Sequence, residues 1–288
     1  MDEMILHSEA VCKDYVSGRG LFGRPLRVTH ALRGISLSVK AGSTMAIVGE
    51  SGSGKSTFGR CVAGLIRPTS GRITLAGQDV RNLRADALPA FRRQVQTIFQ
   101  DPYSSLNPRR TIGAAIMDGM AIHGLYSAEE RRARMRDLLR RVELQPDYEN
   151  RYPHQFSGGQ RQRVAIARAL ALSPRFIIAD EAVSALDVSV KAQVLELLAG
   201  LQAENGLTYL FISHDLGVVR HFADRVAIMS AGELVEEGDC DQIFEAPRND
   251  YTRRLIDAVP RPVPGRRRLR PAPNATPGLV AANPHSSF

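Results

Sequence analysis

The sequence predicts an α/β fold built on a parallel sheet, and two observations lead to this prediction. Short apolar runs alternate with longer segments whose apolar residues recur at helical spacing. The short runs are continuously apolar, which is typical of strands covered on both faces. The predicted buried strands are residues 44–49, 175–180, 208–213 and 225–229.

Two further segments have the pattern of shorter strands. Residues 30–43 and 71–80 are apolar stretches bounded by glycine turns. We expect them to form a small antiparallel sheet beside the main one.

The middle of the chain, from about residue 101 to 162, shows no strand pattern. Ser127 and Glu130 have the spacing of a capping box, which marks the start of a helix. Apolar residues at i, i+3, i+4 and i+7 follow, namely Met135, Leu138, Leu139 and Val142. The pattern predicts a helical lobe inserted into the α/β core. A further amphipathic helix, back in the core, is marked by Val190, Val194, Leu197, Leu198 and Leu201.

Residues 1–260 are expected to form one folded domain, and residues 261–288 differ from it in composition. This tail is rich in Pro, Arg and Ala without periodicity, which is typical of disorder. Five arginines fall within 261–270, and removing their charges from the net charge of +8 leaves +3. No basic stripe with interleaved aromatic residues is present, so we expect no nucleic-acid partner. Contact of the tail with anionic lipid headgroups and a solvated end both remain open.

The sequence predicts a cytoplasmic protein without a membrane span. No apolar run approaches the ~18 residues that a spanning helix needs. The acidic start lacks the features of a signal peptide. Cys12, Cys61 and Cys240 lie far apart without CxxC spacing, which argues against a disulfide framework or a zinc site. We expect all three to be small buried hydrophobic residues.

The stretch GESGSGKST, residues 49–57, matches the phosphate-loop pattern GxxxxGK[ST] between a predicted strand and a helical segment. Its glycines allow backbone N–H groups to face the β- and γ-phosphates of a nucleotide. Lys55 reaches the same oxygens, and the Ser56 hydroxyl is available to Mg²⁺. The predicted nucleotide-binding residues of this loop are Gly49, Glu50, Ser51, Gly52, Ser53, Gly54, Lys55, Ser56 and Thr57.

Two acidic residues follow the predicted strand at 175–180 and supply a second part of the site. Asp180 ends the strand and Glu181 comes next. Consecutive residues near a strand end point in different directions, so the two carboxylates can have separate tasks. We expect Asp180 to hold Mg²⁺, directly or through water. Glu181 is the predicted catalytic residue that polarises the attacking water, work worth roughly 10²- to 10⁴-fold in rate.

The stretch FSGGQRQRVAIARAL, residues 156–170, places Ser157 and two glycines before a helix-forming run. The exposed N–H groups of a helix start and the positive end of its dipole attract anions. The chain therefore has two stretches suited to phosphate, although one nucleotide needs only one phosphate loop.

In this order, GESGSGKST, FSGGQRQRVAIARAL, FIIADEAVSALD and FISHD resemble the ATP-binding subunits of ABC transporters, over about residues 5–260. The resemblance implies a RecA-like P-loop NTPase core with an antiparallel β subdomain and a helical subdomain, and hydrolysis of ATP with Mg²⁺. In that family two such domains pair head to tail. Ser157, Gly158, Gly159 and Gln160 would then cover the ATP held by the phosphate loop of a second ATP-binding subunit, either a copy or a paralogue.

The resemblance implies roles for further residues. Gln100 matches the glutamine that senses Mg²⁺ and links the two lobes, and His214 matches the histidine that contacts the γ-phosphate. Residues 184–187, ending in Asp187, match the loop that communicates across the dimer. Tyr15 matches the aromatic residue that stacks on adenine, although a core tyrosine would give the same pattern.

Three stretches resemble the ATPases of dipeptide, oligopeptide and nickel importers more specifically: FQDPYSSLNPR, RYPHQFSGGQ and YTRRLIDAVP. The resemblance implies two membrane-spanning permease subunits, a solute-binding protein and a peripheral position on the cytoplasmic face of the membrane. In relatives a short helix of the membrane subunit docks beside the glutamine loop, which places a coupling surface near residues 100–125.

The sequence departs from its relatives at two places. Ala182 stands where they usually carry Pro, which removes a fixed φ angle but no chemical group. The tail lacks the cysteines of many relatives, which weakens the assignment to the peptide branch.

Other classes explain fewer of these stretches. Soluble ABC proteins of translation usually carry two cassettes, and those of DNA repair separate the two motifs by a long coiled coil. A metabolic P-loop kinase leaves SGGQ and SALD unexplained. Export stays open in principle, and so does the choice between dipeptide, longer peptide, nickel and another solute as cargo.

Overall fold

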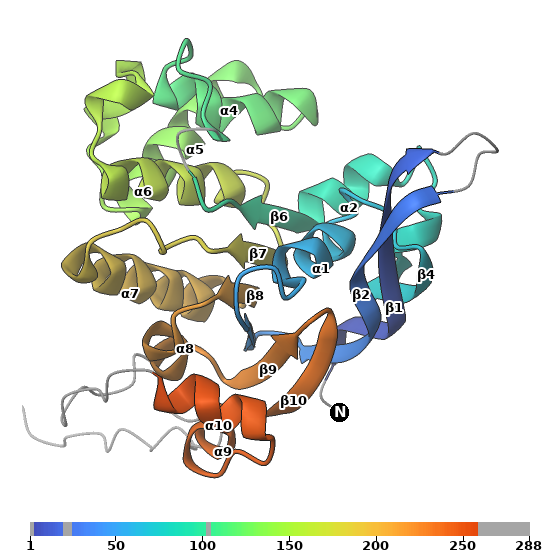
Figure 1. The fold of residues 1–288 in the computed structure, drawn as a ribbon. Coiled ribbons are helices and arrows are strands. Elements are labelled where there is room, and N and C mark those ends of the chain that lie inside the picture. Colours follow the sequence, from blue (N-terminus) through green and yellow to red (C-terminus); the bar gives the residue numbers. More distant parts are fainter. Residues whose placement is uncertain (1–2, 20–24, 102–104, 259–288) are drawn as a thin grey trace, which may run out of the picture.

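The computed structural model describes residues 3–19, 25–101 and 105–258, which form two sheets surrounded by helices (Figure 1). The larger sheet has the strand order β10-β9-β3-β8-β7-β6, and all neighbouring pairs are parallel except β9 with β10. The smaller sheet is antiparallel, in the order β2-β1-β4-β5. The predicted α/β class and the separate antiparallel sheet are both confirmed.

The strands are β1 (Met4–Arg19), β2 (Pro25–Lys40), β3 (Thr44–Val48), β4 (Ser70–Leu75), β5 (Gln78–Asp79), β6 (Val95–Ile98), β7 (Phe176–Asp180), β8 (Thr208–Ser213), β9 (Arg225–Ser230) and β10 (Glu233–Asp239). The α-helices are α1 (Lys55–Val62), α2 (Leu88–Gln94), α4 (Ile112–Ile122), α5 (Ala128–Arg141), α6 (Gly158–Leu170), α7 (Val188–Asn205), α8 (Leu216–Phe222), α9 (Cys240–Glu245) and α10 (Asp250–Asp257). Short 3-10 turns cover Val80–Asn82, Pro146–Asn150 and Pro153–Gln155. No described helix combines the length and apolarity needed to cross a membrane.

The parallel strands are buried on both faces, as their continuous apolar runs predict. Alternate residues contribute to two separate cores, because successive side chains of a strand point to opposite faces. In β8, Tyr209 and Phe211 belong to one core, whereas Leu210 and Ile212 belong to the other. The second core joins the sheet to α1 and to the antiparallel sheet.

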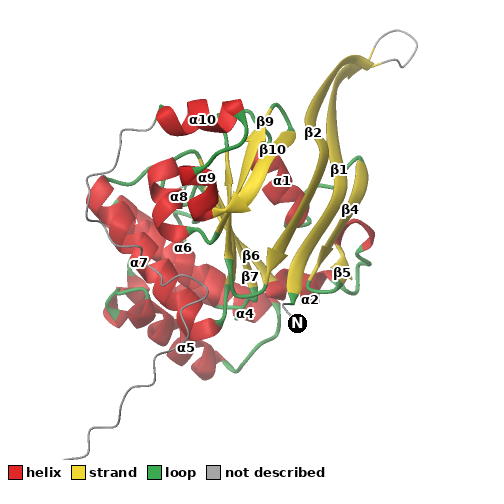
Figure 2. Cartoon of the chain, turned by 90° about the horizontal axis from the view of Figure 1, so that it is seen from below, coloured by secondary structure: helices red, strands yellow, loops and turns green. Residues whose placement is uncertain are grey.

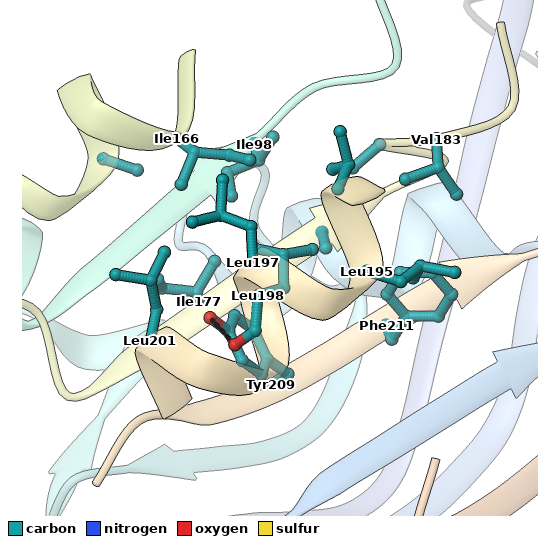
Figure 3. Close-up of a cluster of buried hydrophobic side chains, with 14 of the residues drawn as sticks. Ile98, Ile166, Ile177, Val183, Leu195, Leu197, Leu198, Leu201, Tyr209 and Phe211 are labelled. Atoms are coloured by element: carbon teal, nitrogen blue, oxygen red, sulfur yellow. Dashed lines mark hydrogen bonds between the residues drawn. The ribbon is translucent and has the colours of Figure 1, made fainter. Parts of the chain in front are cut away.

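The first core extends from the larger sheet into the helical region, and Figure 3 shows the part of it around α7 and the strands. Leu195 and Leu198 of α7 pack over Tyr209 and Phe211 of β8. The buried Tyr209 hydroxyl donates to the Leu198 carbonyl oxygen at 3.1 Å, which satisfies its one polar group. Because α7 is buried against the strands, the chain segments that join it to β7 and to β8 are also fixed.

Between β6 and β7 the described residues form helices and no strand, and they lie away from the antiparallel sheet (Figure 2). The predicted capping box opens α5: Glu130 N–H donates to Ser127 Oγ at 3.2 Å, and Ser127 N–H donates to Glu130 Oε2 at 2.7 Å. Glu149 ties the following 3-10 turn to α5, because Arg132 and Arg136 each donate to its Oε1 at 2.7 Å.

Sequence reasoning missed β1, β6 and β10 as strands. β6 has only four residues, and β10 is an edge strand with charged residues at several positions. The cysteine prediction is partly wrong: Cys61 and Cys240 are buried, but Cys12 is only half-buried. The predicted tail at 261–288 lies outside the described residues.

Candidate functional site

Four consecutive strands of the larger sheet end at the same edge, because β3, β8, β7 and β6 are neighbours and parallel. Val48 is aligned with Ser213, Asp180 with Ile212, and Ile98 with Ala179. The chain segments after these strands carry the phosphate loop, His214, Glu181 and Gln100. The topology thus gathers four segments that are far apart in the sequence.

The phosphate loop fits its surroundings only with glycine at two positions. A Cβ atom at Gly49 would lie 2.1 Å from the Met229 carbonyl oxygen of β9. Gly54 has φ +102°, and a Cβ atom there would lie 2.5 Å from the Ala31 carbonyl oxygen of β2. The loop is therefore pressed against backbone on both sides, and α1 begins directly after Gly54.

Lys55 is 4% exposed and its ammonium group lies inside the loop. Nζ donates to the carbonyl oxygens of Gly49 and Glu50, both at 2.8 Å. Burial lowers the Lys55 pKa, and the carboxylates of Glu181 and Asp180 oppose that shift. A cation fixed on a loop with glycines at its bends is suited to bind phosphate oxygens.

Ser56 and Asp180 form the second pair of the site. The Ser56 hydroxyl donates to Asp180 Oδ1 at 2.8 Å. Burial raises the Asp180 pKa, while the Ser56 hydrogen bond and the positive charge of Arg60 oppose the rise. Hydroxyl and carboxylate oxygens are ligands that Mg²⁺ accepts in phosphate sites, where substrate and water supply the rest. Among the described residues no cluster of three or more His, Cys, Asp or Glu side chains is placed to hold a metal ion.

Glu181 follows Asp180 with its backbone in the left-handed region, at φ 51°. Its N–H donates to the Ile212 carbonyl oxygen at 2.9 Å, which pins the turn to β8. The Glu181 carboxylate is 17% exposed, and its Oε2 lies 3.4 Å from Nδ1 of His214. A non-glycine residue in this conformation is uncommon and costs about 1–3 kcal/mol, so the neighbouring structure must hold it. The turn sends the Asp180 and Glu181 side chains to different partners.

Gln100 and Tyr15 lie at the margins of this arrangement. Gln100 is exposed just beyond β6, and residues 102–104 after it lie outside the described chain. Tyr15 is on β1 and 42% exposed, with the Lys13 ammonium 5.3 Å from its ring centroid. The ring is therefore not a core side chain, which was the alternative to a stacking role.

Ser157 is the N-cap of α6 and lies on a surface of the helical region. Gln160 N–H donates to Ser157 Oγ at 3.3 Å, and Ser157 N–H donates to Gln160 Oε1 at 3.0 Å. A Cβ atom at Gly159 would lie 2.4 Å from Cγ1 of Val190, so glycine allows α6 to approach the start of α7. Ser157 and Gly158 are both exposed, and Asp187, the exposed N-cap of α7, has no side-chain capping bond.

Two contacts of the phosphate loop were not foreseen from the sequence. Gly232 N–H, in the turn between β9 and β10, donates to the Ser53 carbonyl oxygen at 3.1 Å. Glu50 N–H donates to the Tyr251 hydroxyl of α10 at 3.4 Å. These partners are about 180 to 200 residues away along the chain, so no local spacing could have revealed them.

Comparison with known proteins places these residues in a family. The family model described as "ABC transporter" matches residues 32–184. A second, described as "Oligopeptide/dipeptide transporter, C-terminal region", matches residues 235–286, which reach into the cysteine-free tail.

Curated relatives are about 50% identical to this chain over the aligned residues. The glutathione import ATP-binding protein GsiA of Salmonella paratyphi A is 50% identical over 268 residues, which cover 93% of this chain and 43% of that protein. The chain thus spans less than half the length of this relative. The oligopeptide transport ATP-binding protein AppF of Bacillus subtilis is 49% identical over 259 residues, 90% of this chain and 79% of that one.

Solved structures share the fold. The ATP-binding cassette MJ0796, described as a dimer in a post-hydrolysis state bound to ADP and Pi, has a TM-score of 0.73 and 34% identity. The aligned residues cover 82% of this chain and 98% of the MJ0796 chain. The structure of cbiO1 from Clostridium perfringens, described as part of an ABC transporter complex, has a TM-score of 0.73 and 29% identity, over 85% of this chain and 92% of its own. The chain therefore belongs to the ABC transporter family, as an ATP-binding cassette.

Proposed function

We propose that the chain is the ATP-hydrolysing subunit of an importer for short peptides, bound to the cytoplasmic face of the cell membrane. The observation that carries the proposal is the edge where β3, β8 and β7 end, at which Lys55, the Ser56–Asp180 pair and the Glu181–His214 pair meet. The names of the relatives support the cargo class, since both glutathione and oligopeptides are short peptides.

Within one chain, the residues divide the chemistry of ATP hydrolysis among them. The phosphate loop, residues 49–57, binds the β- and γ-phosphates with its N–H groups and with Lys55. Ser56 and Asp180, with Gln100, would hold Mg²⁺, which would neutralise charge on the phosphate oxygens. Glu181 polarises the attacking water, and His214 contacts the γ-phosphate from the neighbouring strand end. Tyr15 stacks on the adenine.

A second ATP-binding subunit, a copy of this chain or a paralogue, completes each site. Ser157, Gly158, Gly159 and Gln160 lie at an exposed helix start, where N–H groups and the helix dipole favour the γ-phosphate of a nucleotide on the opposite subunit. Asp187 is the exposed N-cap of α7, the helix whose Val190 lies against Gly159. This pairing explains why one chain carries two phosphate-binding stretches.

Transport requires two membrane-spanning permease subunits and a solute-binding protein, and these set the choice of cargo. A cavity of about 440 Å³ is a suitable dock for a permease segment, since it lies between the sheet and the helical region. Gln96, Asp118, His123 and Arg168 are among its lining residues, in and beside the expected coupling surface at 100–125.

The mass in solution of the Glu181→Gln variant, with and without ATP and Mg²⁺, tests the proposal. Removing the carboxylate stops water polarisation, so we expect ATP to bind and hydrolysis to fall by roughly 10²- to 10⁴-fold. The unhydrolysed nucleotide then holds two chains together, and the mass doubles only with ATP.

Two variants control this measurement. Glu196→Gln changes an exposed glutamate on α7 and should hydrolyse ATP like the wild type. Lys55→Ala should lose ATP affinity and the doubling together. A Glu181→Gln chain that binds ATP but stays single points to a paralogous partner. A wild-type chain that does not bind ATP would refute the proposed ATPase function. Hydrolysis by Glu181→Gln at the wild-type rate would refute the catalytic role of Glu181.

A further inference from the structure

The C-terminal unit, defined as β9, β10, α9 and α10 (residues 225–257), makes two hydrogen bonds with the phosphate loop besides the close approach of Met229 to Gly49. The turn after β9 reaches the Ser53 carbonyl oxygen through Gly232 N–H, at 3.1 Å. The first turn of α10 reaches the other end of the loop, where the Tyr251 hydroxyl accepts the Glu50 N–H at 3.4 Å. Figure 2 shows α10 beside β9 and β10. The loop is thus held by a part of the chain that carries none of the predicted site residues.

A buried carboxylate fixes the start of α10. Glu236 of β10 is 9% exposed, and it accepts the N–H groups of Arg248 at 2.8 Å and Asn249 at 3.1 Å. Burial of the carboxyl group opposes its ionisation, but these and other hydrogen bonds outweigh burial and hold the Glu236 pKa below its ordinary value. Asn249 Oδ1 in turn accepts the Tyr251 N–H at 2.8 Å and caps the helix.

Packing then fixes the direction of the Tyr251 ring. Tyr251, Leu255 and Ile256 are partly buried against the larger hydrophobic core, and Thr252 between them is fully buried. Both ends of the helix face formed by these residues pack against the core. The Tyr251 ring therefore has a fixed position, and only the O–H bond can still rotate. The helix therefore presents a fixed acceptor to the phosphate loop.

The bond to Glu50 lies where the loop has few contacts of its own. Glu50, Ser51 and Gly52 are exposed, and the turn they form is closed by Ser53 N–H donating to the Glu50 carbonyl oxygen at 3.2 Å. That same carbonyl oxygen accepts the Lys55 ammonium at 2.8 Å. The Glu50 N–H itself belongs to the Gly49–Glu50 peptide group, whose Gly49 carbonyl oxygen also accepts the Lys55 ammonium at 2.8 Å. A hydrogen bond that holds this peptide group therefore also holds one of the two carbonyl groups on which Lys55 rests.

We propose that Tyr251 is a positioning residue of the nucleotide site, through which the C-terminal unit sets the affinity of the phosphate loop for ATP. The inference rests on the proposed function, since it assumes that the loop binds ATP. Tyr251 does not contact the nucleotide; it lowers the cost of ordering the loop around the phosphates. The C-terminal family match begins at residue 235, so this brace belongs to the part of the chain that accompanies the cassette in peptide-transporter relatives.

Titration of the full-length chain with ATP and Mg²⁺ tests the proposal in the Tyr251→Phe variant. Phenylalanine keeps the ring and its packing but removes the acceptor. We expect the ATP dissociation constant to rise about 3- to 10-fold, the range of one net hydrogen bond. The turnover number at saturating ATP should change less than twofold, because the groups that act on the γ-phosphate are untouched. Amide exchange at Glu50 should become faster, while exchange within α10 stays unchanged.

Tyr126→Phe is the matched control, because this partly exposed tyrosine lies in the helical region, where its ring stacks under Arg134. It should bind ATP like the wild type. Equal ATP affinity in Tyr251→Phe and wild type, with Lys55→Ala unable to bind, would overturn the role of Tyr251 and leave the proposed function intact. Faster exchange throughout α10 would overturn it as well, since the variant would then have loosened the helix. A wild-type chain that does not bind ATP would overturn the proposed function itself.

Discussion

The sheet edge and the helical region use polar residues in different ways. At the edge, polar residues at or after the ends of β3, β7 and β8 pair with one another: Ser56 of α1 with Asp180, and Glu181 with His214. In the helical region they stabilise helix ends, as Ser127 does for α5 and Ser157 does for α6. The polar side chains at the edge therefore find their partners within one chain, whereas the start of α6 is exposed on the surface.

The two capping boxes have nearly the same geometry, although only one of them is expected to bind a ligand. Ser127 and Ser157 accept the N–H of the residue three positions on, at 3.2 and 3.3 Å, and both boxes are closed by a Glu or Gln side chain. Local geometry alone does not separate a structural cap from a ligand site. What separates them is the setting, because only α6 begins with two glycines and packs its start against α7.

The largest expected effect comes from Ser157→Ala, made in the Glu181→Gln chain. Both serine caps contribute about 1 kcal/mol to their helices, but only Ser157 is expected to meet a nucleotide. Loss of its contact with a charged phosphate should weaken ATP-dependent pairing roughly 10- to 100-fold. The concentration dependence of the mass in solution with ATP measures this change.

Ser127→Ala is the matched control for this prediction. It removes the same kind of cap from α5, so thermal stability should fall by a similar amount in both variants. Pairing should remain at the Glu181→Gln level in the Ser127 variant. Equal pairing in the two variants would mean that Ser157 is only a helix cap, and the comparison between the two helix starts would fail.

The sequence predicted the edge better than the helical region. Buried parallel strands leave a strong signal, and β8 was predicted with its observed bounds. Lys55, Asp180 and Glu181 were predicted to share one site from the phosphate-loop pattern and the strand end, whereas His214 was added only by the family resemblance. The roles of the first three followed from their chemistry, and the resemblance supplied the role of His214.

Contacts between distant segments could not be predicted in the same way. Glu149 follows α5 in a 3-10 turn without any periodic pattern, yet it is buried and binds two arginines. Tyr251 was part of a stretch that marked the subfamily, but nothing in the stretch points to Glu50. Both contacts depend on how whole elements pack, which spacing along the chain does not encode.

A smaller effect is expected from Glu149→Gln, which tests the internal support of the helical region. Hydrogen bonds from Arg136 and Arg132 lower the Glu149 pKa from 4.5 to about 2, so the carboxylate stabilises the folded chain. This contribution is complete above pH 4.5 and is lost as the pH falls toward about 2. We expect the variant to melt roughly 5 °C lower at pH 7.

Melting curves of both chains between pH 7 and pH 3 check this prediction. The difference in melting temperature between wild type and Glu149→Gln should become smaller below pH 4.5. ATP binding at pH 7 should be unchanged, because Glu149 lies in the helical region and not at the sheet edge. A difference in melting temperature that stays constant across the whole pH range would show that the negative charge of Glu149 does not stabilise the folded chain.

The smallest effect is expected from Ala182→Pro, which returns the residue usual in relatives to the sheet edge. Ala182 is 2% exposed, and within the described residues no backbone hydrogen bond uses its N–H, so proline removes none. Proline at a compatible φ restricts the unfolded chain and adds about 0.4–1 kcal/mol, which should raise the melting temperature by up to about 4 °C. ATP hydrolysis should stay near the wild-type rate, because Glu181 is already held by its bond to Ile212. A lower melting temperature together with lost hydrolysis would show that the turn at φ 51° before Ala182 does not tolerate the ring, and that this edge has adapted to alanine.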